Sequence, residues 1–258
     1  TRVLVSAPLG TTGGDEVRGR TSDRSPSEIR PTLIEVGVNK HAEGSALIRV
    51  GDTQVLCTAS VDEKVPGFLQ GSGEGWVTAE YGMLPRATSS RAAREAIRGR
   101  PTGRSQEIQR LIGRSLRAVV DRRALGERTI VLDCDVLRAD GGTRCASITG
   151  GFAALAVALD GLRARKKLPG RPLLGQVAAI SAGICAGELL VELDYPEDSS
   201  AEVDLNVVRL DGNRYVELQG TAEETAFGRE QLGGLLDLAH RGIEDLFQMQ
   251  REALGRIL

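Results

Sequence analysis

Residues 129–162 read TIVLDCDVLRADGGTRCASITGGFAALAVALDGL, and this stretch decides the fold. Residues 129–137 form a strongly apolar run with the length and composition of a buried strand. The turn at 139–142 holds two glycines, and a helix is expected to begin within 143–147. The apolar stripe of that helix recurs at helical spacing, at Ile148, Phe152, Leu155, Leu159 and Leu162. Strand, glycine turn and helix together indicate layered α/β packing.

Similar patterns flank this unit on both sides. Before it, a turn at Gly51-Asp52 joins two predicted strands, and the predicted elements are strands at 45–50, 53–60 and 78–83 and a helix from an N-cap at Ser105 to about Val120. After it, the predicted elements are strands at 177–184, 189–193, 203–210 and 215–218 and a helix at 229–254. The sequence therefore predicts a mixed α/β (α+β) fold of two halves that join near residues 163–172.

The composition is that of a soluble globular protein. Of 258 residues, 41% are hydrophobic and 26% are charged, and the formal net charge is −2. Aromatic residues make up only 3%, which argues against base stacking on aromatic platforms as a mode of nucleic-acid binding. The uncharged stretch at 173–187 is too short for a membrane span, which needs about 20 apolar residues. No membrane association and no secretory leader are expected.

The cysteines are scattered through apolar segments and form no C-x-x-C pair; they are Cys57, Cys134, Cys145 and Cys185. The chain has only two histidines, so this pattern does not suggest a zinc site. Buried, reduced thiols of a cytoplasmic protein are the expected interpretation.

The turn at 140–144 reads Asp-Gly-Gly-Thr-Arg and admits two interpretations. Two glycines let the backbone approach a ligand closely, and the start of the following helix offers free N–H groups to an anion. Thr143 adds a hydroxyl donor and Arg144 a planar guanidinium. The alternative is an ordinary strand-to-helix turn with a solvent-facing arginine, which these residues alone favour. The Gly-Lys-Ser/Thr pattern of nucleotide triphosphatases is missing, so that class is not indicated.

Positive charge is concentrated between residues 86 and 117. This segment has nine arginines and only two acids, which gives it a charge of +7 in a chain of net charge −2. One interpretation is a track for the RNA phosphate backbone, whose binding would weaken as salt rises. The other is a solvated helix face combined with a subunit interface. The two interpretations are compatible, and the sequence favours neither.

A third cluster is acidic. From residue 201 to 208, apolar and polar residues alternate, as in a strand that buries one face and carries Glu202, Asp204 and Asn206 on the other. Asp198 is expected in the preceding turn, from which it could converge on Asp204. Paired carboxylates suit Mg²⁺, which binds a few carboxylates together with substrate phosphate. A solvated turn with scattered acids is the commoner alternative.

Taken together and in this order, several strings resemble the RNase PH family of phosphorolytic exoribonucleases, relatives of polynucleotide phosphorylase and of the exosome ring. The matching strings are EIRP (28–31), GRSQEIQRLI (103–112), DGGTRCASITG (140–150), LDYPED (193–198), AEVDLN (201–206) and LQGTAE (218–223). The resemblance covers the chain from about residue 20 onward, and it reverses the choice at the glycine turn in favour of a phosphate seat. The single-unit length is similar to stand-alone members rather than to the duplicated polynucleotide phosphorylase.

The resemblance implies a role for each matching residue. Those that would bind phosphate are Arg104, Gly142, Thr143 and Arg144. The catalytic, metal-associated aspartates would be Asp198 and Asp204, with Mg²⁺ as the divalent cofactor and inorganic phosphate as co-substrate. The arginines linked to RNA binding and assembly would be Arg86, Arg91 and Arg94.

The same resemblance implies a fold, an activity and an assembly. The fold would be two α/β units, residues 20–165, similar to domain 2 of ribosomal protein S5, and residues 166–258, after a flexible tail at 1–19. The activity would be phosphate-dependent 3′-to-5′ exonuclease (tRNA nucleotidyltransferase) action on the 3′ ends of precursor tRNA, with release of nucleoside diphosphates. The assembly would be a cytoplasmic homohexamer, a trimer of dimers.

Two segments depart from the family pattern. Ser22-Asp23-Arg24 stands where the family often has Asp-Gly-Arg, and residues 224–228 differ from the usual continuation. Neither touches the phosphate seat, so activity is still expected. Two rival functions remain. One is a non-catalytic RNA-binding ring subunit of an exosome-like assembly, and the other is a metal-dependent hydrolytic nuclease, which needs carboxylates but no phosphate seat.

Overall fold

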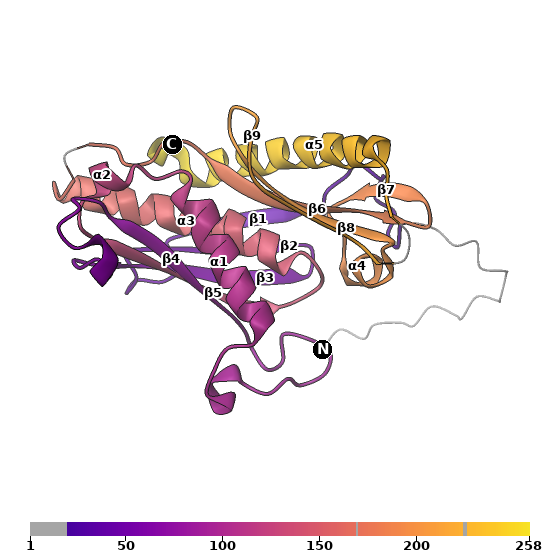
Figure 1. Ribbon diagram of the computed structural model, residues 1–258, viewed down its shortest axis with the longest axis horizontal. Coiled ribbons are helices and arrows are strands. Elements are labelled where there is room, and N and C mark those ends of the chain that lie inside the picture. The colour runs from indigo at the N-terminus through magenta and orange to yellow at the C-terminus, as the bar shows by residue number, and fades with distance from the viewer. Residues whose placement is uncertain (1–19, 169, 224–225) are drawn as a thin grey trace, which may run out of the picture.

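A computed structural model describes residues 20–168, 170–223 and 226–258 of the chain. The flexible tail predicted at 1–19 lies outside the described residues, as do Pro169 in the predicted connector and residues 224–225 of the second departing segment. The described chain folds into two β-sheets with helices packed against both (Figure 1). The mixed α/β fold predicted from the sequence is therefore confirmed.

The first sheet has five strands in the order β1-β2-β3-β5-β4. The strands are β1 (Thr32–Val36), β2 (Gly44–Val50), β3 (Thr53–Asp62), β4 (Trp76–Met83) and β5 (Thr129–Arg138). Only β4 and β5 pair in parallel. The β2–β3 register places Val50 opposite Thr53, which confirms the predicted hairpin turn at Gly51-Asp52.

The second sheet has four antiparallel strands in the order β7-β6-β8-β9. They are β6 (Val177–Cys185), β7 (Glu188–Val191), β8 (Val203–Leu210) and β9 (Arg214–Ala222). Every residue of β6 is buried because both of its faces are covered. The domain boundary predicted between residues 165 and 166 falls between the first sheet's last helix, α3, and β6.

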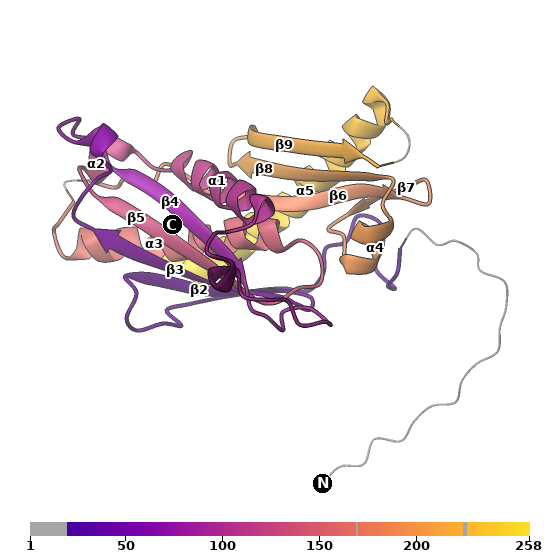
Figure 2. The ribbon, with the colours of Figure 1, turned by 60° about the horizontal axis from the view of Figure 1, so that its bottom comes forward.

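Helix α3 (Thr143–Ala164) is the central element, because it contacts strands of both sheets. Its residues Ile148, Phe152 and Leu155 are fully buried, and it packs beside α1 (Gly103–Arg117) on the first sheet (Figure 2). By length and composition alone, α3 could cross a membrane, but most of it is buried inside the protein. A helix that is apolar on all sides fits this position between two sheets.

The remaining helices are one long helix, α5, which covers the second sheet, and several short ones. Helix α5 (Arg229–Leu254) packs against the second sheet on the face opposite α3, where its Leu235, Ile243 and Phe247 join the core. The short helices are α2 (Arg122–Leu125), α4 (Tyr195–Ser200), η1 (Gly67–Leu69), η2 (Glu95–Arg98) and η3 (Gly255–Ile257). All four cysteines are buried and free, as the sequence predicts.

Three local predictions were wrong. The N-cap of α1 is Thr102 rather than Ser105: the Thr102 hydroxyl accepts the Ser105 N–H, and Ser105 itself is buried. Asp198 lies in a helix, α4, rather than in a turn, because Asp194 and Glu197 form a capping box that starts one. The last strand is longer than the predicted 215–218, since β9 pairs with β8 along nearly its whole length.

Gly44→Ala is expected to destabilise the fold by about 2 kcal/mol or more, within the usual cost of overpacking a core. A Cβ at Gly44 would overlap the Ala154 carbonyl oxygen and lie 2.6 Å from the Ala158 nitrogen, both in α3. Urea unfolding measures the change. The control is Gly233→Ala on α5, where a Cβ meets nothing within 4 Å and helix propensity should add stability. Equal stability of the two variants would contradict this packing of β2 against α3.

Candidate active site

A cleft of about 1040 Å³ collects the predicted site residues from elements far apart in the chain. The residues predicted to bind phosphate or to act in catalysis all line it: Arg104, Gly142, Thr143, Arg144, Asp198 and Asp204. They come from α1, the loop before α3, α3 itself, α4 and β8. The structure therefore brings the three separate sequence clusters together at one place between the two sheets.

The glycine loop adopts a conformation that only glycine takes up readily. Gly141 and Gly142 have φ values of +73° and +64°. A Cβ at Gly141 would lie 2.6 Å from the Leu193 carbonyl oxygen, so the loop packs directly against the second half of the chain. Gly142 is the N-cap of α3 and has no side chain to cap the helix. The first amides of α3 are therefore left for an anion.

Thr143 and Arg144 are held in place by side chains that the sequence reading did not single out. The Thr143 hydroxyl lies 2.9 Å from the phenol oxygen of Tyr81, and burial raises the pKa of that phenol. The Arg144 guanidinium donates to Gln219 at 2.5 Å and pairs with Glu107 at 3.5 Å. Both Glu107 and Gln219 occur in the matching strings, but no spacing rule places them beside Arg144.

Arg104 differs from Arg144 in having no ion pair or hydrogen bond from its side chain to any described residue. It begins the first turn of α1 and is exposed to solvent in the cleft. Its positive charge nevertheless acts on the acids of the cleft, since it opposes the rise that burial causes in the pKa values of Asp198 and Asp204. An arginine that is near carboxylates but unpaired is available to bind an anionic ligand.

The two carboxylates line the same cleft, and the pKa values of both are raised. Burial raises the pKa of Asp204 to about 6, the negative charge of Asp198 adds to the effect, and Arg144 opposes it. Burial also raises the pKa of Asp198, while Arg104 and Arg144 oppose that shift. The Asn206 amide donates to the Asp204 carboxylate at 3.1 Å and accepts from the Cys145 thiol at 3.3 Å. The hydrogen bond from Asn206 thereby fixes the orientation of the Asp204 carboxylate.

This pair of carboxylates fits a divalent cation of the Mg²⁺ type. Among the described residues, no cluster of three or more His, Cys, Asp or Glu side chains is arranged to hold a metal ion. Mg²⁺ does not need one, because it keeps several waters and binds through one or two carboxylates plus substrate phosphates. The repulsion between Asp198 and Asp204 is an electrostatic feature that a cation would relieve.

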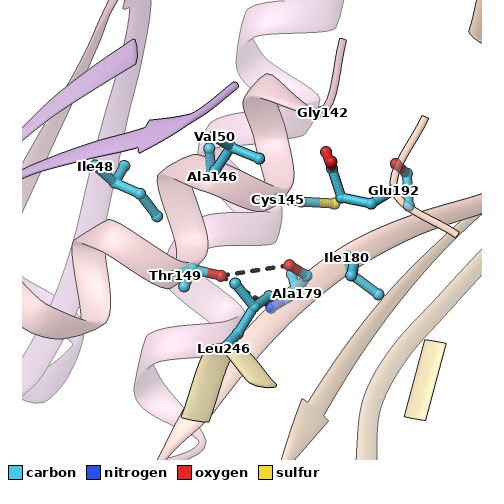
Figure 3. A pocket seen from close by; sticks show the side chains of 11 residues that line it. Ile48, Val50, Gly142, Cys145, Ala146, Thr149, Ala179, Ile180, Glu192 and Leu246 are labelled. Atoms are coloured by element: carbon cyan, nitrogen blue, oxygen red, sulfur yellow. Dashed lines mark hydrogen bonds between the residues drawn. The ribbon is translucent and has the colours of Figure 1, made fainter. Parts of the chain in front are cut away.

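A buried ion-pair network supports the loop from behind. The Arg30 guanidinium donates to both carboxylate oxygens of Glu192, at 2.8 and 2.6 Å, and to the backbone carbonyl of Asp140 at 2.5 Å. Thr53 donates to the Gly141 carbonyl at 2.7 Å. Figure 3 shows Gly142 and Glu192 beside a cavity of about 20 Å³, room for about one water molecule.

The N-terminal segment joins this network. Arg24, in the string that departs from the family pattern, lies 3.5 Å from Glu192 and 3.5 Å from Glu197. Arg20 pairs with Glu197 at 3.2 Å. The departing string therefore keeps an arginine against the acids that support the cleft.

Arg86, Arg91 and Arg94 do not line the cleft. They lie in the segment between β4 and α1, where all three are exposed and form no ion pair with a described residue. The cleft is instead bordered by Thr88, Ser89 and Ser90 of the same segment. A long anion that leaves the cleft along this segment would reach exposed arginines.

The fold and the cleft define a two-unit protein in which a glycine loop and an unpaired arginine lie in one cleft with a pair of carboxylates. Sequence models of domain 1 and domain 2 of the 3′ exoribonuclease (RNase PH) family match residues 28–159 and 175–242. The chain belongs to this family.

Solved structures confirm the fold. The chain is similar to an Archaeoglobus fulgidus exosome protein in a structure with RNA bound to the active site (23% identity, 89% and 91% of the two chains covered, TM-score 0.75). It is also similar to rice (Oryza sativa) Rrp46 (17%, 93% and 100%, 0.71) and to an archaeal exosome core protein (21%, 88% and 89%, 0.70). At these identities the likeness shows the fold alone.

Asp204→Asn is expected to raise the thermal midpoint at pH 8 but hardly at pH 4, in buffer with EDTA and without phosphate. The folded-state pKa of about 6 lies above the ordinary aspartate value of about 3.9. The contribution of Asp204 to the free energy of unfolding is therefore fully present below about pH 4 and is lost as the pH rises through about 6. The loss amounts to at most ~3 kcal/mol. The neutral amide escapes that loss. Asp237→Asn, at an exposed site on α5, is the control and should change nothing. A gain that is the same at both pH values would refute the shift.

Proposed function

We propose that this protein is a phosphorolytic 3′-to-5′ exoribonuclease that trims the 3′ ends of precursor tRNA with inorganic phosphate. The observation that carries the proposal is the cleft in which an unpaired Arg104, the uncapped start of α3 and the Asp198–Asp204 pair converge. An anion seat beside carboxylates suits a reaction in which phosphate is the attacking reagent. A hydrolytic nuclease would need the carboxylates but not the seat.

The residues of the seat would hold and orient the attacking phosphate. Arg104, Arg144, the Thr143 hydroxyl and the first amides of α3 supply its hydrogen bonds. A phosphate oxygen attacks the phosphorus of the last phosphodiester, and the bond to the 3′ oxygen of the preceding nucleotide breaks. A nucleoside diphosphate leaves, and the RNA is one nucleotide shorter with a free 3′ hydroxyl. The reverse reaction adds a nucleotide. Positioning and charge stabilisation are the protein's main contributions.

The leaving 3′ oxygen needs a proton, and the raised pKa of Asp204 suits it to the role of donor. Its pKa of about 6 leaves part of the carboxyl protonated near neutral pH. Mg²⁺ held by Asp198 and Asp204 would offset negative charge on the transferring phosphoryl group. An oxygen of Asp204 that carries the proton cannot also bind Mg²⁺. Proton donation and Mg²⁺ binding would therefore use different carboxylate oxygens of Asp198 and Asp204.

The exposed arginines outside the cleft would guide RNA to it. Arg86, Arg91 and Arg94 are unpaired and border the segment that lines the cleft, which suits contact with a phosphate backbone. The similar Archaeoglobus protein comes from an exosome with RNA bound to the active site, which supports an RNA substrate here. We propose assembly as a cytoplasmic homohexamer, a trimer of dimers.

A non-catalytic RNA-binding ring subunit is the second candidate. The similarity to rice Rrp46 and to archaeal exosome core proteins favours it as much as it favours an enzyme. The two candidates differ in chemistry, because a scaffold has no need for an unpaired arginine opposite two carboxylates. The presence of all six cleft residues therefore supports the enzyme.

A tRNA with extra 3′ nucleotides, incubated with Mg²⁺ with and without phosphate, tests the proposal. We expect nucleoside diphosphates only when phosphate is present, resolved by chromatography of the products. Nucleoside monophosphates formed without phosphate would identify hydrolysis instead. No products under either condition, with RNA still bound, would identify the ring subunit.

Arg104→Ala is expected to raise the KM for phosphate by roughly 10- to 100-fold, the loss of a charge-assisted contact. Phosphate titrations at saturating RNA measure it. Arg110→Ala is the matched control, because Arg110 is exposed on the same helix but does not line the cleft. An unchanged phosphate KM for Arg104→Ala would remove this residue from the seat.

A further inference from the structure

The cleft holds one aromatic side chain among its described lining residues, Tyr195 of α4. The chain has few aromatic residues, and yet this tyrosine is 63% exposed. Its phenol has no hydrogen bond to a described residue; only its backbone N–H is used, toward Asp140 at 3.3 Å. The ring is therefore not needed by the fold as described, and it stands free at the wall of the cleft.

The position of Tyr195 relates it to the reacting centre. Asp198 follows it by three residues in α4, and residues at this spacing share a helix face with Cβ atoms about 5–6 Å apart. The N–H bond to Asp140 also fixes the start of α4 against the residue that precedes the glycine loop. The ring thus lies about one helical turn from Asp198, and both residues line the same cleft.

The cleft is much larger than a phosphate seat requires. Its volume of about 1040 Å³ is at the upper end of the range for small-molecule sites, about 300–1,000 Å³. Beside the charged and amide side chains of the cleft, its lining includes the hydroxyls of Ser89 and Ser90 and the thioether of Met83, which is 41% exposed at the end of β4. A thioether is polarizable and packs well against flat rings. Tyr195 and Met83 therefore provide a flat and a polarizable surface within a cleft that is otherwise largely polar.

We propose that the Tyr195 ring stacks on the base of the 3′-terminal nucleotide and forms a base-binding subsite that accepts any base. The inference rests on the proposed function, since it names how that site holds its RNA end. Stacking tolerates sequence because every base presents a π face. The low aromatic content excludes an extended platform of rings, as expected from the sequence, but a single ring at the cleft suffices for the terminal base.

Two fluorescent oligoribonucleotides test the inference, one with a normal 3′-terminal nucleotide and one that lacks only the terminal base. Binding is followed by fluorescence anisotropy in phosphate-free buffer, and a gel verifies that the RNA stays intact. Tyr195→Ala is expected to weaken binding of the normal RNA about tenfold and of the abasic RNA less than about twofold. Tyr195→Phe keeps the ring and should bind like the wild type.

Tyr215→Ala is the matched control, because Tyr215 is also exposed (44%) but lies on β9 and does not line the cleft. It should change neither affinity. If Tyr195→Ala loses affinity equally for both RNAs, or for neither, the stacking subsite is overturned. The same holds if the wild-type protein binds both RNAs with equal affinity. Binding is measured without turnover, so base-dependent binding by a protein that fails the phosphorolysis assay would overturn the activity and leave the subsite standing.

Discussion

The buried ion pair between Arg30 and Glu192 is the interaction on which the site depends. Both residues are almost fully buried, and Arg30 also reaches the Asp140 carbonyl. Three segments therefore meet at one guanidinium: the strand entry before β1, the loop after β5, and the chain that leads from β7 into α4. Removing one partner of such a pair leaves a buried charge, which typically costs about 3–5 kcal/mol. This ion pair fixes the position of the glycine loop relative to helix α4, which carries Asp198.

The cleft contains positive and negative side chains that are not all paired with one another. Arg144 is already engaged by Glu107 and Gln219, whereas Arg104 has no partner among the described residues. The acids Asp198 and Asp204 are half-buried, and burial raises the pKa of both; the charge of Asp198 adds to the rise at Asp204. Such a site gains from a ligand that brings an anion to the arginines and a cation or a proton to the acids. Phosphate, RNA and Mg²⁺ together have this character.

Local signals predicted most elements but misplaced some of their ends. The apolar run at 129–137 and the stripe of α3 were unambiguous because burial imposes their periodicity. The start of α1 was misplaced by three residues, since two hydroxyl residues compete for the cap and packing buries one of them. Helix α4 was missed because six residues are too few for a periodic pattern, although Asp194 and Glu197 carry the capping box.

The sequence by itself determined the order of the elements, the residue types of the proposed phosphate seat and of the acid pair, and, through its ordered strings, the family. Only the tertiary structure decided that Arg104, Arg144 and Asp204 share one cleft, that Asn206 orients Asp204, and that Tyr195 stands exposed beside them. The reason is physical. Hydrophobic periodicity is a local property of the chain. In contrast, pKa shifts, partners and exposure depend on distances between residues far apart in the sequence, such as Arg30 and Glu192, 162 positions apart, and packing alone sets those distances.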